Sequence, residues 1–292
     1  MVGAQGEAGR STVSHNPPQR QGGPHNDNQS PDRPDATKAQ FGDDVLMGLR
    51  FFSRLPTGDR PHRQPELTRI AMALPFTSVI IGVVPALLLL GASLIGLPTL
   101  FAAGLAVAAS VLVTGAMAED ALADAADGLF GGSTHERRLE IMKDSRHGTY
   151  GVAALCLLLL LRVAALSALA AISPLAAAAM WLAAMLLARS GALWLSVALP
   201  AARPNGVAAA AGRVSKPAFA MGAIFALILG LILAAPGAGL AGFLLAVVLA
   251  ALVAWGWTVL CRVLVGGHTG DLIGALQALL EISALAAFLV FV

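Results

Sequence analysis

Long apolar runs separated by short polar links make up most of this chain. No charged residue occurs between Ala71 and Ala118, a stretch long enough to cross a bilayer twice. With a link at 97–99, the apolar segments are about 72–96, 100–118, 151–172, 175–199, 218–235, 239–261 and 272–292. About 18 apolar residues suffice to span the hydrocarbon core. The pattern therefore predicts an all-α, polytopic integral membrane protein with about seven transmembrane helices.

The composition agrees with this fold class. Of the 292 residues, 57% are hydrophobic and 12% are charged, against about 25% charged in soluble domains. The net charge is only +2 and no basic, aromatic-rich patch occurs, so no nucleic-acid partner is expected. Cys156 and Cys261 stand alone in apolar runs, which indicates packed thiols rather than a metal or redox site.

The N-terminal region differs from the rest. Residues 1–40 are rich in Gly, Pro, Asn, Gln and Ser, so we expect a disordered tail without the apolar core of a signal peptide. Residues 41–292 are expected to form a single transmembrane catalytic domain. Its first part, 41–69, predicts a short amphipathic helix on the membrane surface, broken at 55–58. The arginines expected to point toward lipid phosphates are Arg50, Arg54, Arg60, Arg63 and Arg69.

The links alternate between neutral and charged. Those at 97–99, 173–174 and 236–237 are neutral, and the links between them carry the charge. Short loops rich in Lys and Arg stay in the cytoplasm. We therefore expect the N-terminus and every polar motif on the cytoplasmic face of the inner membrane, and the C-terminus outside.

One charged link is unusually acidic. Residues 119–151 hold seven of the 17 acidic residues and four of the 19 basic ones. Asp120, Asp124 and Asp127 are spaced i, i+4, i+7, so a helix at about 100° per residue places them within roughly 60° of one another. Such a face is best explained by a divalent cation, and Mg²⁺ prefers carboxylate oxygens and substrate phosphates. The alternative is a solvated acidic turn that complements the helix dipole.

Both signs of charge follow this face. Residues 136–144 predict a short amphipathic helix with Glu140 and Asp144 on one side, while Lys143 and Arg146 add positive charge. A metal-and-phosphate site needs acids for the metal and cations for the phosphate oxygens. A surface helix with paired charges would explain the same pattern.

Two glycine-rich segments border these helices. Gly128, Gly131 and Gly132 end the acidic helix, either to admit a phosphate or as an ordinary helix stop. The segment from Gly266 to Asp271 leads into the last span. Asp271 either caps that span or joins the site on the same face.

Three charges lie inside predicted spans. Arg162 and Arg189 fall in the third and fourth spans, and Glu281 in the last is a possible partner. Charges at such depth pair with one another or line a polar cavity. A structural ion pair and a substrate contact both remain open.

These residues resemble the cobalamin synthase family, also called adenosylcobinamide-GDP ribazoletransferases. The central match consists of Thr114-Gly115, Glu119-Asp120-Ala-Leu-Ala-Asp124-Ala-Ala-Asp127-Gly128 and Arg138-Leu-Glu140-Ile-Met-Lys143-Asp144-Ser-Arg146-His-Gly148-Thr-Tyr-Gly151. Further matches are Phe51-Phe-Ser-Arg54-Leu-Pro56, Leu199-Pro-Ala-Ala-Arg203-Pro-Asn-Gly206 and Gly266-Gly-His-Thr-Gly270-Asp271-Leu-Ile-Gly274-Ala275. The likeness covers about residues 41–292.

The chain departs from the family pattern at three places. Ala118 and Ala121 stand where the family usually has a His and a Gly, and Ala278 stands where some members have a Glu or Gln. Glu281 is a candidate replacement for the last of these. These departures bear on catalytic efficiency more than on membership of the family. One alternative to an active enzyme is therefore a catalytically impaired homologue.

The resemblance implies the final step of cobalamin assembly. α-Ribazole, or its 5′-phosphate, attacks the phosphate attached to cobinamide in adenosylcobinamide-GDP, and GMP leaves in a Mg²⁺-dependent reaction. In-line displacement at phosphorus calls for carboxylates that hold metal ions. The expected catalytic set is Asp120, Asp124, Asp127 and Asp144, with the first three as metal ligands. The expected phosphate-binding set is Lys143, Arg146 and Arg203, with Glu140 and Asp271 in support.

Other functions compete with this one. A CDP-alcohol-type membrane phosphotransferase also uses spaced aspartates with Mg²⁺, but its usual signature places Ala-Arg after the first Asp-Gly and spaces its aspartates more widely. A transporter would need polar residues at the midplane of several spans, whereas the acids here gather at one face. Membrane lipid is an expected partner, and a homo-oligomer is left open.

Overall fold

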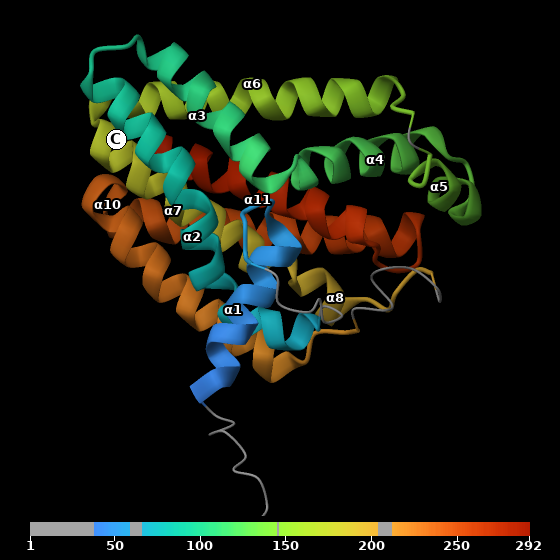
Figure 1. Ribbon diagram of the computed structural model, residues 1–292. Helices are drawn as coiled ribbons and strands as arrows, with labels where there is room; N and C mark the ends of the chain where they lie inside the picture. The colour runs from blue at the N-terminus through green and yellow to red at the C-terminus, as the bar shows by residue number, and fades with distance from the viewer. Residues whose placement is uncertain (1–37, 59–65, 145, 204–211) are drawn as a thin grey trace, which may run out of the picture. The chain divides into compact units, whose positions relative to one another are not determined.

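The computed structural model describes residues 38–58, 66–144, 146–203 and 212–292, with side chains from Phe41 onward. These residues are helical and contain no strand apart from one isolated bridge between Ala201 and His268. In chain order the helices are α1 (Lys38–Phe52), α2 (Leu67–Leu94), α3 (Thr99–Thr114), α4 (Met117–Gly131), α5 (His135–Ile141), α6 (Thr149–Ile172), α7 (Pro174–Ala192), α8 (Trp194–Ala198), α10 (Lys216–Leu264) and α11 (Gly270–Leu289) (Figure 1). The predicted tail lies almost wholly outside the described residues.

Five helical stretches are long and apolar enough to cross a membrane. They are α2, α6, α7 continued by α8, α10 and α11, and the pair α3–α4, bent by 86°, is a broken span or a re-entrant segment. The 49 residues of α10 are two arms joined at Gly239, whose backbone is not helical (φ 68°). The all-α membrane fold class is confirmed, and the exact number of crossings stays a prediction. The fifth link, which is neutral, was expected at 236–237, two residues before the break.

Hydroxyl side chains begin three of the long helices. Ser173 accepts a hydrogen bond from the backbone N–H of Ala176 at the start of α7, and Pro174 occupies the first turn. Ser215 and Thr269 cap α10 and α11 in the same way. Each cap satisfies a backbone donor that the helix itself cannot, so the polar links fix where the spans begin.

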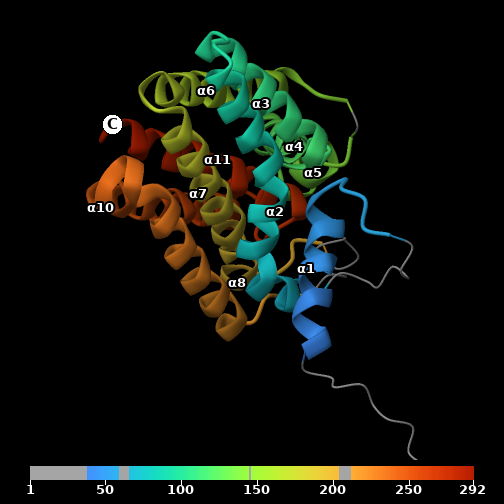
Figure 2. The ribbon, with the colours of Figure 1, turned by 60° about the vertical axis from the view of Figure 1, so that its left-hand side comes forward.

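Helix α7 is at the centre of the packing. It contacts α2, α6, α10 and α11 (Figures 1 and 2). Trp181 on this helix is fully buried. Small residues let neighbouring helices approach closely, as is common between membrane helices. Gly222 of α10, for example, faces the carbonyl oxygen of Ala71 in α2, where a Cβ would collide.

Two of the N-terminal arginines that were expected to face lipid phosphates pair within the protein instead. Arg69 forms an ion pair with Asp44 (2.6 Å) that joins α2 to α1. Arg50 donates to the hydroxyl of Thr57 (2.9 Å) and holds the turn after α1. Because α1 packs on α2, these two side chains form contacts within the protein and are not free to bind lipid phosphates. Arg60 and Arg63 lie outside the described residues.

The charges within the spans form one buried network. Arg162 donates to Glu119 (2.6 Å) and to Glu281 (3.0 Å), and Glu281 also accepts from the indole of Trp181 (2.9 Å). Arg189 is buried close by. The predicted pairing of Arg162 with Glu281 is confirmed. Glu119 was not predicted as a partner, because its neighbours in sequence suggested a solvated face.

Candidate active site

The acidic helix α4 lies between two long helices. It packs on α6 and α11 and turns away from α3 at Gly115 and Ala116, which both have left-handed backbone conformations (φ 67° and 59°). For Ala116 this conformation costs about 1–2 kcal/mol. The bend thus stores strain directly before the aspartates. On the α11 side, Ala121 meets Gly274 so closely that a Cβ on the glycine would lie 2.5 Å from it.

Asp120 and Asp124 form the accessible part of the predicted acidic face. The Asp120 side chain is 65% exposed and that of Asp124 is 18% exposed. His147, from the loop before α6, places Nε2 3.8 Å from Asp120 and Nδ1 3.7 Å from Asp124. Asp271 at the start of α11 is also close enough to act on the charge of Asp124. Three like charges therefore meet here, with one imidazole between two of them.

Asp127, the third predicted metal ligand, has a different position. It is 7% exposed, and its two carboxylate oxygens accept the backbone N–H groups of Gly148 (2.6 Å) and Gly151 (2.8 Å). These groups are at the first turn of α6, which has no cap of its own. Asp127 thus caps α6 from α4, where its negative charge also complements the helix dipole.

Asp127→Ala is expected to lower the stability of the fold by about 1–3 kcal/mol, since it removes the acceptor of the buried Gly151 N–H and of the partly buried Gly148 N–H. Asp127→Asn should lose less, because the amide oxygen can still accept one bond. Thermal unfolding in detergent would measure both. Asp120→Ala, at an exposed position of the same helix, is the control. Equal unfolding temperatures for Asp127→Ala and Asp120→Ala would contradict the capping role.

The same approach of α4 and α6 explains Gly151. A Cβ there would lie 2.8 Å from the carbonyl oxygen of Ala123 and would also overlap the Asp127 carboxylate. Gly151→Ala is therefore expected to cost about 1–3 kcal/mol of stability. Gly104→Ala in α3 has open space around its Cβ and should be neutral or stabilising. A Gly151→Ala protein as stable as Gly104→Ala would refute the close packing.

The glycines that end α4 serve packing. A Cβ at Gly128 would collide with Met142, and one at Gly132 would collide with Arg138. Arg138 itself donates to the carbonyl of Leu129 (3.2 Å) and to that of Leu264 in α10 (3.0 Å). Gly132 ends α4, as the helix-stop interpretation expects, and the structure adds a packing role for Gly128 and Gly132 that was not predicted.

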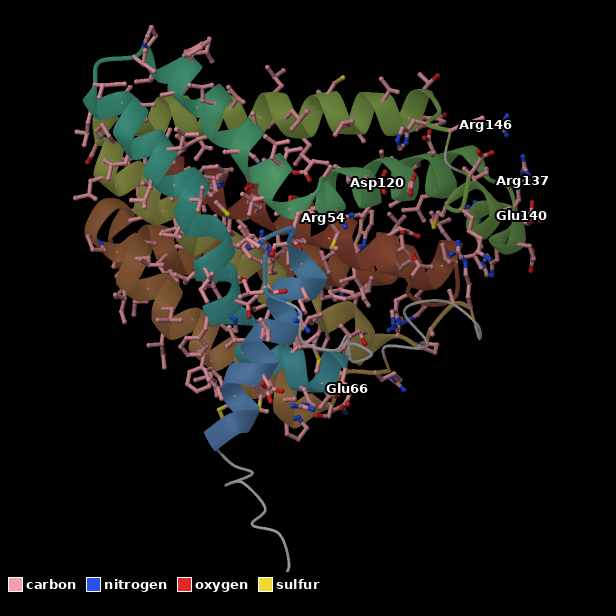
Figure 3. All side chains as sticks on the ribbon, in the orientation of Figure 1. Arg54, Glu66, Asp120, Arg137, Glu140 and Arg146 are labelled. Carbon is pink, nitrogen blue, oxygen red and sulfur yellow. The ribbon has the colours of Figure 1, made fainter. Side chains whose placement is uncertain are left out.

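The exposed charges of α5 and the following loop are paired with each other. Glu140 pairs with Arg137 (3.0 Å), and Asp144 with Arg146 (2.6 Å), at the far end of the α4–α5 hairpin (Figure 3). The hydrogen bond from the Arg146 guanidinium lowers the pKa of Asp144 to about 2, which favours the ionised carboxylate. Lys143 is exposed. These residues lie at the outer edge of the acidic face, which we call the rim, and do not contact Asp124.

The two later motifs lie side by side. The backbone N–H of His268 donates to the carbonyl of Pro200 (2.8 Å), and that of Ala202 donates to the carbonyl of His268 (2.9 Å). Gly267 permits this, because a Cβ would lie 2.6 Å from the Pro200 oxygen. Residues 199–203 and 266–271 therefore form one unit.

His268 is a buried support of that unit. Its Nδ1 lies 3.1 Å and 3.0 Å from the carbonyl oxygens of Leu199 and Pro200, so Nδ1 carries the proton. Burial lowers the pKa of the imidazole, which keeps it neutral.

Arg203 and Asp271 project from the same unit. Arg203 donates to the carbonyl of Leu139 in α5 and is close enough to Asp271 to act on its charge. Asp271 accepts from the hydroxyl of Thr269 (3.3 Å). The capping of α11 belongs to Thr269, so Asp271 is available to the site.

The residues present suit a divalent cation only in part. Within the described ranges, no three His, Cys, Asp or Glu side chains are close enough to hold a metal ion among them. Asp120 and Asp124 nevertheless share only the imidazole of His147 as a partner and act electrostatically together with a third carboxylate, Asp271, and neighbouring like charges favour a cation. The carboxylates of Asp120 and Asp124, with Asp271, are the residues that could hold it.

Two residues near the acidic face were missed as site candidates. His147 belongs to the matched run 138–151, and only its position opposite α4 reveals its role. Arg54 was expected to face lipid, yet its backbone N–H donates to the carbonyl of Val113 (2.7 Å), and its side chain lies against Gly115 at the start of α4 (Figure 3). The Phe-Ser-Arg-Leu-Pro motif was the available signal for Arg54.

Residues 44–289 match the family model described as cobalamin-5-phosphate synthase. The chain belongs to the cobalamin-5-phosphate synthase family. Among its curated relatives, the adenosylcobinamide-GDP ribazoletransferase of Azorhizobium caulinodans is 44% identical over 252 residues, covering 85% of this chain and 96% of the relative. The enzymes of the same name from Sinorhizobium medicae and Rhizobium etli are 43% and 40% identical over 85% and 84% of this chain, and 96% and 95% of their own. No solved structure matches.

The three departures from the cobalamin synthase pattern fall at buried positions. Ala118, Ala121 and Ala278 are 6%, 7% and 0% exposed, so each packs between helices. Glu281 does not replace a polar group in the active site, because its oxygens bind Arg162 and Trp181. His147 does supply an imidazole beside Asp120.

Proposed function

We propose that this cobalamin-5-phosphate synthase homologue catalyses the final step in assembling the nucleotide loop of cobalamin. The substrates are adenosylcobinamide-GDP and α-ribazole or its 5′-phosphate. The 5′ oxygen forms a new bond to the phosphate attached to cobinamide, and the bond from that phosphate to GMP breaks. The products are adenosylcobalamin, or its 5′-phosphate, and GMP. The family match over residues 44–289 carries this proposal.

The accessible acidic face supports phosphoryl transfer at α4. Asp120 and Asp124, with Asp271 opposite them, would hold Mg²⁺, which supplies charge neutralisation to the reacting phosphate. Asp127 contributes by fixing the start of α6, and through it the loop that carries His147. His147 is the proposed acceptor of the proton that the attacking 5′ hydroxyl loses, because Asp124 lies 3.7 Å from its ring.

Cations around this face suit the diphosphate of the substrate. Arg203 projects from the 199–203 segment toward Asp271, and Arg54 lies at the bend before α4. Arg146 and Lys143 at the rim are exposed and would meet the nucleotide first. Arg and Lys side chains neutralise phosphate oxygens and orient them for attack.

The proposed location is the inner membrane with the site facing the cytoplasm. The charged links at 199–216 and 262–271 support this orientation by the positive-inside rule.

A reaction in proteoliposomes tests the function. The purified protein is incubated with adenosylcobinamide-GDP and α-ribazole, with Mg²⁺ or with EDTA, and the corrinoid mass and released GMP are measured. Equal amounts of cobalamin and GMP, formed only with Mg²⁺, are expected. The proposal would be overturned if this protein formed no product while a relative such as the Azorhizobium enzyme, assayed in parallel, was active. The substitution Ala118→His would then test whether the chain is an impaired homologue.

A further inference from the structure

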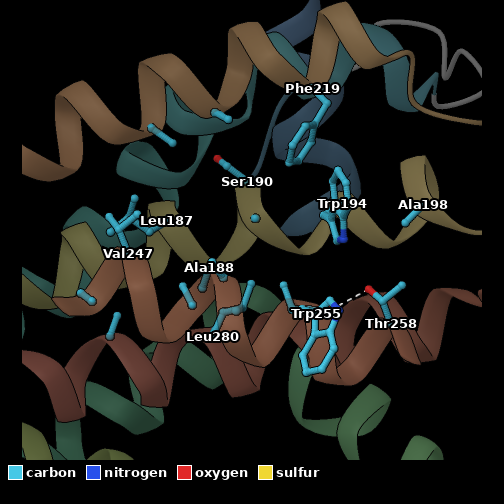
Figure 4. A pocket seen from close by; sticks show the side chains of 18 of the residues that line it. Leu187, Ala188, Ser190, Trp194, Ala198, Phe219, Val247, Trp255, Thr258 and Leu280 are labelled. Atoms are coloured by element: carbon cyan, nitrogen blue, oxygen red, sulfur yellow. Dashed lines mark hydrogen bonds between the residues drawn. The ribbon is translucent and has the colours of Figure 1, made fainter. Parts of the chain in front are cut away.

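A large apolar cavity lies away from the acidic face. Its volume is about 540 Å³, and it is bounded by the two arms of α10, by α7 with α8, and by α11 (Figure 4). Trp194, Phe219 and Trp255 contribute aromatic walls, and the remaining lining is mostly Ala, Leu and Val. Among the residues that the structure describes, no carboxylate lines it, so it differs in kind from the proposed catalytic site.

The cavity opens on a surface that would face the bilayer. Trp255 is 68% exposed, and Leu227 and Val259 are each 39% exposed. All three are on α10, the most apolar of the candidate membrane spans. A cavity at this position is filled by hydrocarbon rather than by water.

Two polar groups in the cavity call for a partner. The hydroxyl of Ser190 is buried and has no hydrogen-bond partner among the described residues, and Figure 4 shows it directed into the cavity. Thr258, by contrast, is satisfied by the carbonyl of Ala254 (2.6 Å). At one end the lining includes the exposed Arg262, which has no ion pair with the residues that the structure describes. An occupant should therefore be apolar, carry one hydrogen-bond acceptor within the cavity and end in negative charge.

We propose that this cavity binds an anionic phospholipid of the bilayer. One acyl chain fills the space between the arms of α10, an ester carbonyl accepts the hydrogen bond of Ser190, and the phosphate lies beside Arg262. From Val247 to Arg262 the lining follows α10 for about 22 Å at 1.5 Å per residue. That length exceeds the roughly 15 Å depth of one leaflet, so an acyl chain fits. Trp194 and Trp255 suit the level where chains meet headgroups.

The bound lipid would hold the α10 hairpin against α7 and α11. The two arms are joined at the break near Gly239, and the cavity separates them further along. A lipid in this place supplies the missing contacts between them.

Photocrosslinking tests the site. The protein is reconstituted in phosphatidylcholine nanodiscs with a trace of phosphatidylglycerol that carries a diazirine in one acyl chain, and labelled peptides are identified by mass spectrometry. Labelling is expected on peptides that contain Ala223 and Ala251. Ala251→Trp should reduce it severalfold, whereas Leu252→Trp, an exposed neighbour outside the cavity, should not.

A second experiment tests recognition of the lipid headgroup, with Arg262→Gln as the variant and Lys216→Gln as its control. Arg262→Gln should remove the preference for photoreactive phosphatidylglycerol over photoreactive phosphatidylcholine, and Lys216→Gln should keep it. Equal labelling in Ala251→Trp and Leu252→Trp, or equal labelling by both lipids in the unaltered protein, would overturn the proposal. So would displacement of the label by α-ribazole, which would make the cavity a substrate site. Size-exclusion chromatography checks that each variant is folded.

Discussion

Asp124→Asn is expected to lower the turnover of adenosylcobinamide-GDP by roughly 100-fold or more, with the fold unchanged. Asp124 is the aspartate with the most neighbours in the site. Asp120 on the same helix, His147 from the loop before α6 and Asp271 at the start of α11 are all close enough to act on its charge. An amide of the same shape removes the negative charge that would bind Mg²⁺ and orient the imidazole. Loss of a metal ligand or of general-base assistance costs about 10²–10⁴ in rate.

The measurement is GMP release in proteoliposomes over a range of Mg²⁺ concentrations. Glu136→Gln, an acidic residue of α5 outside the site, is the matched control and should retain full activity. Asp124→Asn should also need more Mg²⁺ to reach half of its remaining rate. Full activity with an unchanged Mg²⁺ requirement would remove Asp124 from the metal set.

Sequence patterns predicted the long elements of the fold well. Apolar runs gave the spans, and the neutral link predicted at 173–174 falls where α7 begins, at a capping hydroxyl and a proline in the first turn. Such signals need only a few adjacent residues. The turn between the fifth and sixth predicted spans was placed at Pro236 and Gly237, whereas the backbone of α10 breaks at Gly239. Pro236, Gly237 and Gly239 all permit a break, so the sequence pattern does not single out one of them.

The site was harder to predict, because helical periodicity describes one helix at a time. It correctly placed Asp120, Asp124 and Asp127 on one face, yet it could not show that α6 begins against that face. The capping role of Asp127 depends on Gly148 and Gly151, which lie more than 20 residues later in the chain. His147 was overlooked for the same reason.

Arg162→Met is expected to be the most destabilising substitution among those considered. Arg162 is 2% exposed and holds the carboxylates of Glu119 and Glu281, which lie on different helices. Without it, two acidic groups and Arg189 remain in the apolar interior with a net negative charge. Removing one partner of a buried ion pair typically costs 3–5 kcal/mol. Thermal unfolding in detergent measures the loss.

A second change should restore much of that stability. In the double variant Arg162→Met with Glu119→Gln, the remaining charges of Arg189 and Glu281 balance, so the double variant is expected to unfold at a higher temperature than Arg162→Met alone. If the second substitution destabilised the protein further, charge balance would not be what the network provides. Glu119 directly precedes Asp120, so the network also fixes α4 against α6. Arg162→Met protein that remains folded should accordingly lose activity through misplaced aspartates, and the double variant, which does not restore that anchor, should stay impaired even as its stability recovers.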